Sequence, residues 1–266
     1  MRPADAHTGA GTGAAAPPDA TGVEDTLELR LTEELLALLG DDPSASAPRP
    51  DAPDRVGGPD LLRGPDRVGG SDLFVAPDLL GGPGTWRPVT TPAGVFQLVA
   101  VELERDLGVI SRWMNDPAVA AFWELAGPES VTAGHLRRQI EGDGRSVPCL
   151  GVLGGRPMSY WEVYRADLDP LARHYPSRPH DIGVHLLIGG VGNRGRGIGT
   201  VLLRAVSDLV LDNRPPCARV VAEPDLRNTP SVSAFLSAGF RFAAEVELPD
   251  KRAALMVRDR AHRAQL

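Results

Sequence analysis

Hydrophobic and polar positions follow two different periods in residues 86–266. The longest helical pattern runs from Ile198 to about Asn213, where apolar residues recur three and four positions apart and form one stripe. Short runs rich in β-branched residues and leucine are typical of strands. Together these patterns predict further helices at 107–114, 134–141 and 230–238, and strands at 95–101, 149–153, 158–163, around His185, 219–222, 240–248 and 253–258.

Turn and capping signals agree with these boundaries. Gly154-Gly155 separates two strands as the turn of a hairpin does. The helix at 230–238 has Thr229 as its predicted N-cap, Pro230 at its first position and Gly239 just past its end. Strands therefore alternate with helices, which predicts an α/β fold with a mixed central sheet flanked by helices.

Residues 1–85 differ sharply in composition from the remainder. They hold 11 of the 25 prolines, 13 of the 30 glycines, 15 acidic residues and 6 basic ones. A segment of this kind cannot bury enough apolar surface to fold by itself. We therefore expect a low-complexity, acidic, mostly disordered extension at 1–85 and a folded domain at 86–266.

Two patterns stand out within the extension. A twelve-residue repeat begins at Pro53 and again at Pro65, and the segment from Glu24 to Leu39 has the leucine spacing of an amphipathic helix. Two and a half copies are too few for a solenoid, so the pattern favours a flexible linker. Docking of a partner through the extension is the alternative.

Charge and composition exclude several classes of protein. The net charge is −7 and no basic patch is present, which argues against nucleic-acid binding. No apolar run approaches the ~20 residues of a membrane span, and no secretory signal is visible. Cys149 and Cys217 are too few for a zinc site and are predicted to be buried free thiols, which fits a reducing cytoplasm. Metal binding has no support in the sequence.

A glycine-rich segment links the strand around His185 to the long helix. It reads Arg194-Gly195-Arg196-Gly197-Ile198-Gly199. Glycines leave the first helical turn without side chains, so its free N–H groups and the positive end of the helix dipole can face a phosphorylated ligand. The spacing matches neither a dinucleotide-binding fingerprint nor a P-loop. We therefore predict a pyrophosphate site of another kind, with Arg194 and Arg196 adding mobile positive charge at its mouth.

The pattern Arg194-x-x-Gly197-x-Gly199, between a strand and a helix, resembles the acyl-CoA loop of the GNAT N-acyltransferase superfamily. Other segments between about Phe96 and Arg260 are similar to the siderophore-biosynthesis branch, which is related to the aerobactin and mycobactin lysine N-acyltransferases. These segments are Trp113-Met114-Asn115, Phe122-Trp123-Glu124, Gly127-Pro128, residues 160–164, residues 220–228 and residues 247–256.

This resemblance implies a GNAT-type acyltransferase fold in which the strands carrying His185 and Arg219 splay apart, with the cofactor arm between them. It also implies an acyl-CoA co-substrate carrying an acetyl, succinyl or longer group. The residues predicted to bind the cofactor are Leu187, Ile188, Arg194, Gly195, Arg196, Gly197, Ile198, Gly199, Asn228 and Ser231.

His185 is the predicted catalytic residue. A lone histidine between apolar neighbours is more often a core residue, but the family's conserved His-Leu-Leu-Ile-Gly pattern matches here. Its role would be to accept a proton as the substrate nitrogen attacks the thioester, with an imidazole pKa of about 6.5. Asp225 is the second catalytic candidate, as a carboxylate that orients the imidazole. Glu223 lies on the same strand face, and the choice between the two stays open at this point.

The resemblance implies that the substrate is a small hydroxylated amine, namely N6-hydroxylysine, N5-hydroxyornithine or N-hydroxycadaverine, which would become a hydroxamate. Phe235 stands where many GNAT enzymes carry a tyrosine that protonates the leaving thiolate. A thiol with a pKa of about 8.5 can leave without that acid. Substrate contacts are predicted at Trp123, Tyr160, Trp161, Glu162, Tyr164 and Glu223 and in the segment 165–180.

Two alternative functions remain at this level. One is a generic GNAT N-acetyltransferase that acts on an aminoglycoside, a polyamine or a protein N-terminus. The other is a non-catalytic acyl-CoA-binding protein, against which the intact Arg194, Gly197, Gly199 and His185 argue. The segment 247–256 favours the hydroxamate-forming branch over the generic one.

Overall fold

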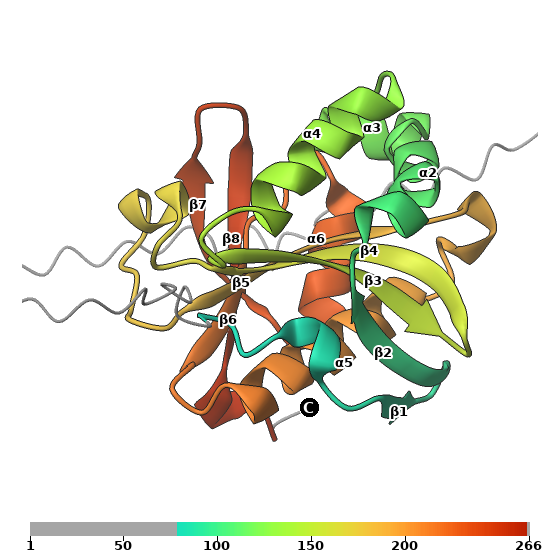
Figure 1. The fold of residues 1–266 in the computed structure, drawn as a ribbon. Helices are drawn as coiled ribbons and strands as arrows, with labels where there is room; N and C mark the ends of the chain where they lie inside the picture. Colours follow the sequence, from blue (N-terminus) through green and yellow to red (C-terminus); the bar gives the residue numbers. More distant parts are fainter. Residues whose placement is uncertain (1–78, 265–266) are drawn as a thin grey trace, which may run out of the picture. The chain divides into compact units, whose positions relative to one another are not determined.

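The computed structural model describes residues 79–264, so the predictions for the extension lie outside the described residues. A single mixed sheet organises this part of the chain, with strand order β1-β2-β3-β4-β5-β6-β8-β7 (Figure 1). All neighbouring strands are antiparallel except β5 and β6, which are parallel. The strands are β1 (Val89–Thr91), β2 (Gly94–Ala100), β3 (Ser146–Leu153), β4 (Arg156–Arg165), β5 (Ile182–Ile188), β6 (Arg219–Ala222), β7 (Arg241–Glu247) and β8 (Arg252–Asp259).

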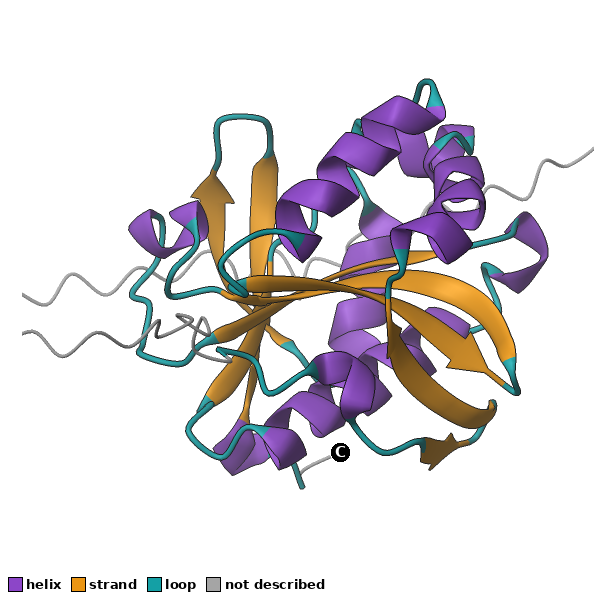
Figure 2. Cartoon of the chain, in the orientation of Figure 1, coloured by secondary structure: helices purple, strands orange, loops and turns teal. Residues whose placement is uncertain are grey.

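Helices cover both faces of the sheet. Figures 1 and 2 show α2, α3 and α4 together on one side, while α5 and α6 pack on the other. The α-helices are α2 (Leu103–Met114), α3 (Pro117–Trp123), α4 (Glu129–Ile140), α5 (Ile198–Asn213) and α6 (Thr229–Ser237), and the 3₁₀ turns are η1 (Pro83–Thr85), η2 (Pro170–Arg173), η3 (Val191–Asn193) and η4 (Arg260–His262).

The predicted α/β fold with a mixed sheet is confirmed, and the bounds of α5 and β6 agree with the sequence pattern. Two elements were missed: β1, which is only three residues long, and α3, whose Asp116 N-cap accepts a hydrogen bond from the Ala118 amide. One cap was wrong. Asn228, not Thr229, caps α6, because its side chain accepts the Ser231 amide and Thr229 is already helical.

Strand alternation decides which side chains of β4 meet which helices. Trp161 and Val163 are fully buried in the main core, together with Leu202 and Val206 of α5. Tyr160, Glu162 and Tyr164 point to the opposite face, which α2, α3 and α4 cover near Tyr160. The sheet therefore brings a row of polar β4 side chains under the helices of that face.

The strands β5 and β6 diverge after two residue pairs. Ile182 pairs with Val220 and Gly183 with Val221, after which β5 continues to Ile188 paired with β4 and no longer with β6. The chain that follows β6 turns instead toward β8, where Asp225 forms an isolated bridge with Ala253. The splay that the family resemblance implies is thus confirmed, and it opens the sheet beside His185.

The described part of the chain begins inside the folded core. Leu80 is 1% exposed and packs with Trp86, whose indole donates a hydrogen bond to the Gly81 carbonyl. Arg214 at the end of α5 also donates to the Leu79 carbonyl at 3.0 Å. The folded domain therefore includes Leu79 and Leu80, a few residues before the position expected from composition.

A truncated chain that begins at Asp78 should fold and turn over like the full chain, because the residues it lacks have the composition of a disordered segment. A chain that begins at Gly84 should be less stable by about 2–5 kcal/mol, the usual effect of removing a buried leucine side chain. Thermal unfolding followed by circular dichroism compares the two. Equal melting temperatures would contradict a core role for Leu80.

Candidate active site

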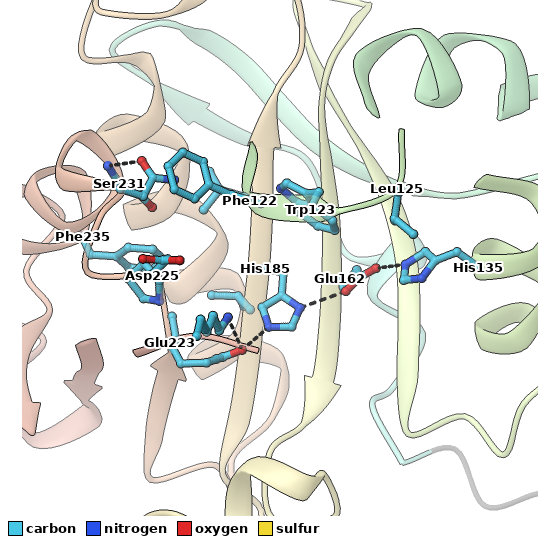
Figure 3. A pocket seen from close by; sticks show the side chains of 16 residues that line it. Phe122, Trp123, Leu125, His135, Glu162, His185, Glu223, Asp225, Ser231 and Phe235 are labelled. Atoms are coloured by element: carbon cyan, nitrogen blue, oxygen red, sulfur yellow. Dashed lines mark hydrogen bonds and ion pairs between the residues drawn. The ribbon is translucent and has the colours of Figure 1, made fainter. Parts of the chain in front are cut away.

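Strand register brings three ionisable side chains together where β5 and β6 diverge. Glu162 of β4 lies directly opposite His185 of β5. Gly183 pairs with Val221, so Glu223, two residues further on, continues the same face of the sheet. Figure 3 shows His185 between the two glutamates, with Trp123 beside them at the end of α3.

Both ring nitrogens of His185 meet a carboxylate. Nδ1 lies 2.9 Å from Oε2 of Glu162, and Nε2 contacts Oε1 of Glu223. The ring also lies 4.7 Å from the Tyr164 ring and meets the edge of Trp123, with 6.2 Å between centroids. The side chain stays 35% exposed. His185 is therefore oriented on both sides and still reachable by a ligand.

Charge balance fixes the protonation state of this triad. Burial alone lowers the pKa of His185, but the charge of Glu223 and the hydrogen bonds that the ring donates to both carboxylates outweigh it and raise the pKa to about 10. Burial raises the pKa of Glu223, and the opposing charge of His185 brings it down to about 2. The two carboxylates therefore favour the protonated ring over the neutral imidazole, with a pKa of about 6.5, that the sequence suggested.

Glu162 is the most heavily hydrogen-bonded carboxylate of the site. Its Oε1 lies 2.5 Å from Nε2 of His135 and accepts from Gln139 at 2.7 Å and from the Tyr160 hydroxyl at 2.9 Å. Burial raises the pKa of Glu162, but its hydrogen bonds with His135 and His185 outweigh burial and hold that pKa well below its usual range. Sequence reasoning missed His135 and Gln139, whose spacing of four places them on one face of α4.

Glu223 is held from the other side by Tyr164 and Lys251. The Tyr164 hydroxyl donates to Oε2 at 2.7 Å, and Nζ of Lys251 lies 3.7 Å from Oε1. Tyr164 reaches Glu223 because its ring lies across Gly183, where a Cβ atom would stand 2.0 Å from Cζ of the tyrosine. Sequence reasoning did not name Lys251 as a site residue, although the segment 247–256 that carries the family resemblance contains it.

The residues predicted to contact substrate divide into three groups. Trp123, Glu162 and Glu223 line the cleft. Tyr160 and Tyr164 are buried and instead hold the two glutamates. Trp161 was placed wrongly, since strand alternation turns it to the opposite face, where its indole donates to Ser159 in the core.

The segment 165–180 does not belong to the lining residues of the cleft. Arg165 pairs with Asp167 at 2.7 Å, and the His180 amide also donates to Asp167. Leu171 and Tyr175 pack into a second hydrophobic cluster with Tyr164. The segment therefore supports the face of the sheet from which Tyr164 reaches Glu223.

The open choice between Asp225 and Glu223 is resolved by their contacts. The Asp225 carboxylate accepts hydrogen bonds from the backbone amide of Arg227 at 2.8 Å and from its guanidinium at 2.6 Å. Among the described residues, none of its hydrogen bonds or ion pairs reaches His185. Glu223 and Glu162 therefore orient the imidazole, while Asp225 lines the cleft beside it.

The cleft in front of His185 encloses about 280 Å³. One wall is aromatic and comes from the end of α3, and the other is formed by the loop after β6 and by α6 (Figure 3). Phe235 lies on this second wall and is fixed by edge-to-face packing on Phe240. The lining residues include Phe122, Trp123, Leu125, Val184, Leu186, Ala222, Asp225, Asn228, Ser231 and Lys251.

The predicted pyrophosphate loop precedes α5. Gly195 and Gly197 have φ values of +71° and +72°, a left-handed conformation, and a Cβ atom at either position would meet no other atom within 4 Å. The amides of the first turn of α5 have no partner within the helix and lie next to this open space. The loop therefore fits an anionic ligand such as a diphosphate.

The sequence suggested that Arg194 and Arg196 are both mobile cations. Arg196 is exposed, as that prediction requires, whereas Arg194 is held by other groups of the protein. The Arg194 guanidinium donates to the Ile188 carbonyl at 3.0 Å and pairs with Asp116, the N-cap of α3, at 3.0 Å. Its Nη2 atom is buried with no hydrogen-bond partner among the described residues. Arg194 thus ties the loop to α3 and retains one buried donor. The buried Leu187 and half-buried Ile188 lie in core clusters beside it.

The amino-acid sequence that forms this site matches a known family. Residues 102–248 match the profile of the acetyltransferase (GNAT) domain. The chain belongs to the GNAT acetyltransferase family. It is therefore an acyl-CoA-dependent acyltransferase by descent, with Glu162, His185 and Glu223 at the point where GNAT strands separate.

The relatives of this GNAT protein include enzymes named for lysine derivatives. It is 36% identical over 154 residues to the lysine N-acyltransferase MbtK of Mycolicibacterium paratuberculosis, which covers 58% of this chain and 69% of that enzyme. It is 38% identical over 152 residues to the N(6)-hydroxylysine O-acetyltransferase of Escherichia coli, or 57% of this chain and 48% of that enzyme. The hydroxyornithine transacylase SID3 of Ajellomyces capsulatus is 29% identical over 153 residues, or 58% and 35%.

Solved structures support the fold. An uncharacterised protein from Bacillus halodurans aligns with a TM-score of 0.63 and 32% identity, covering 66% of this chain and 91% of that one. The aminoglycoside acetyltransferase AAC(6')-Ib, solved with coenzyme A, aligns with a TM-score of 0.55 and 22% identity, covering 64% and 99%. At that identity the second likeness shows the GNAT fold alone.

Two features are absent from residues 79–264. None of the helices there is long and apolar enough to cross a membrane. No group of three or more His, Cys, Asp or Glu side chains in this range is arranged to hold a metal ion.

Proposed function

We propose that this GNAT enzyme transfers the acyl group of an acyl-CoA to the nitrogen of a hydroxylated side-chain amine and so forms a hydroxamate. The substrates proposed are N6-hydroxylysine, N5-hydroxyornithine or N-hydroxycadaverine. The names of the relatives support this substrate class, because they include a hydroxylysine acetyltransferase and a hydroxyornithine transacylase. The product is a ligand with hard oxygen donors, as siderophores require for iron.

The observation that carries the proposal is that both ring nitrogens of His185 contact carboxylates, which favours the protonated ring. An imidazolium held between Glu162 and Glu223 is a poor base. An ordinary lysine amine, with a pKa of about 10.4, must lose a proton before it can attack. A hydroxylamine nitrogen is far less basic and arrives at neutral pH as the free base. The site therefore suits a nucleophile that needs no prior deprotonation.

The reaction balances without any further reagent. The nitrogen attacks the thioester carbon, the C–N bond forms, and the C–S bond breaks to release the CoA thiolate. The attacking nitrogen becomes positively charged and strongly acidic, so even carboxylates with a lowered pKa, such as Glu223, can accept its proton. That proton finally resides on the thiol. Because a thiol pKa is about 8.5, departure needs no acid at Phe235.

The loop before α5 is proposed to bind the diphosphate of the acyl-CoA. Its left-handed glycines leave open space over the helix N-terminus, where backbone amides and the helix dipole favour an anion. Asn228 and Ser231, which line the cleft at the start of α6, are proposed to contact the cofactor arm beside the splayed strands. The identity of the acyl group, whether acetyl, succinyl or longer, is left to experiment.

Release of free CoA thiol should test the proposed function. The enzyme is incubated with acetyl-, succinyl- and longer acyl-CoA and with N6-hydroxylysine, N5-hydroxyornithine, N-hydroxycadaverine and their unhydroxylated counterparts. We expect turnover with at least one hydroxylated amine and far slower turnover with its counterpart. Equal rates for the two forms, or activity only on an aminoglycoside or polyamine control, would refute the proposal in favour of the generic GNAT alternative.

A further inference from the structure

Lys251 is the only lysine among the 28 lysine and arginine residues of the chain. It stands between β7 and β8, immediately before Arg252, and it lines the cleft. Its Nζ atom lies 3.7 Å from Oε1 of Glu223, which is longer than a hydrogen bond, and the side chain is 22% exposed. Within residues 79–264, this ion pair is the contact that the ammonium makes.

The carboxylates of the cleft already accept hydrogen bonds from other donors, although each oxygen of Glu223 keeps room for one more. Glu162 has four donors around it, Glu223 is bonded to Tyr164 and His185, and Asp225 is bonded to Arg227. An ammonium has three N–H donors. Lys251 therefore keeps donors that face the cleft and that a bound ligand can use.

We propose that Lys251 recognises the N-hydroxyl group of the amine and makes the site selective for hydroxylated over unhydroxylated amines, an inference that rests on the proposed function. An N-hydroxyl oxygen accepts a hydrogen bond, and its O–H donates one. Lys251 and Glu223 form a donor and an acceptor 3.7 Å apart, a gap that a hydroxyl group bonded to both can occupy. Lys251 is thus a specificity residue for the reaction.

The charges around Glu223 favour the same choice. His185 and Lys251 both carry positive charge, and both lie against the same Oε1 atom. An unhydroxylated amine with a pKa of about 10.4 arrives as an ammonium and is repelled by these two cations. The neutral hydroxylamine meets no such repulsion and gains a hydrogen bond from an ionised donor.

The identity of the cation also matters. An arginine at this position would present a planar fork that fits the Glu223 carboxylate with two parallel hydrogen bonds. Its donors would then be used within the protein instead of facing the cleft. A lysine, whose ammonium is a compact point charge, leaves donors for the substrate.

The test replaces Lys251 by methionine, which keeps most of the length of the unbranched side chain and removes its charge. KM is measured for N6-hydroxylysine, and lysine is titrated as an inhibitor; N5-hydroxyornithine and ornithine form a parallel pair. In Lys251→Met, KM for the hydroxylated amine should rise about 10- to 100-fold, the range for losing a hydrogen bond to a charged group. Inhibition by the unhydroxylated amine should become tighter, because Glu223 and Asp225 lose a competing cation.

A higher KM for the hydroxylated amine together with tighter inhibition by the unhydroxylated one would indicate lost recognition. Damage to the fold would instead weaken the binding of both amines. Arg252→Met is the matched control, because Arg252 is 62% exposed and pairs with Glu245 and Glu247 outside the cleft; it should leave both constants unchanged. Lys251→Arg should raise KM for the hydroxylated amine as Lys251→Met does, but it should leave inhibition by the unhydroxylated amine unchanged, because arginine keeps the positive charge. Parallel losses for both amines, or no change in Lys251→Met, would overturn the inference. A wild-type enzyme that acylates no hydroxylated amine would instead refute the proposed function before any substitution is compared.

Discussion

Replacing His185 by alanine should lower kcat by about 10²–10³-fold while acyl-CoA affinity stays nearly unchanged. The protonated ring neutralises Glu162 and Glu223 in the cleft where the nitrogen is proposed to attack the thioester. Removing one preorganised electrostatic group typically costs this much in rate. The diphosphate loop lies on a different segment, at Gly195 and Gly197, so cofactor binding should survive. Steady-state kinetics and a direct CoA-binding measurement separate the two effects.

His185→Gln is the informative companion, because glutamine can donate one hydrogen bond but carries no charge. If charge is what matters, both substitutions lose activity to a similar extent. Full turnover of His185→Gln would show that the ring serves only as a hydrogen-bonding spacer between the strands.

The pH profile gives an independent test of the role of His185. Its folded-state pKa of about 10 lies above the ordinary value of about 6.5. Its contribution to kcat/KM and to stability should therefore be complete below about pH 6.5 and should disappear as the pH rises through about 10. The His185→Gln variant should lack this alkaline limb. An acidic limb near pH 6.5 that vanishes in the variant would restore the role of a neutral base.

Gly197→Asp should abolish the rise in melting temperature that acyl-CoA causes. A ligand at 100 times its Kd stabilises a protein by about 2.7 kcal/mol. Gly197 is the N-cap of α5, and a Cβ atom there projects into the open space over the first turn. An aspartate would place a side chain and a negative charge where the diphosphate is proposed to bind. Differential scanning fluorimetry with and without acyl-CoA measures the loss.

Gly154→Asp is the matched control for backbone strain. Gly154 also has a positive φ, of +54°, and a Cβ atom there would meet no other atom within 4 Å, but this glycine forms the β3–β4 hairpin turn. The Gly154→Asp variant should keep the full shift in melting temperature. An unchanged shift in Gly197→Asp would remove the glycine loop from the cofactor site.

The amino-acid sequence determined the parts of this protein that depend on local order. The apolar stripe of α5 fixed its bounds, because a helix of 16 residues repeats its signal over several turns. The glycines before it indicated a bare helix N-terminus, since only glycine readily takes the left-handed conformation there. The motif Arg194-x-x-Gly197-x-Gly199, together with the segments 160–164, 220–228 and 247–256, indicated the GNAT family, which the match of residues 102–248 confirms.

The tertiary structure decided what depends on neighbours that are distant in sequence. Strand register placed Glu162 against His185, and divergence of β5 from β6 placed Glu223 on its other side. The pKa of an imidazole depends on the charges beside it, so the sequence suggested a base and the fold made an imidazolium. The surroundings of two other residues also depend on the tertiary structure. Alternation along β4 turns Trp161 into the core. The β7–β8 turn brings Lys251 within 3.7 Å of Glu223, and its proposed role depends on that contact.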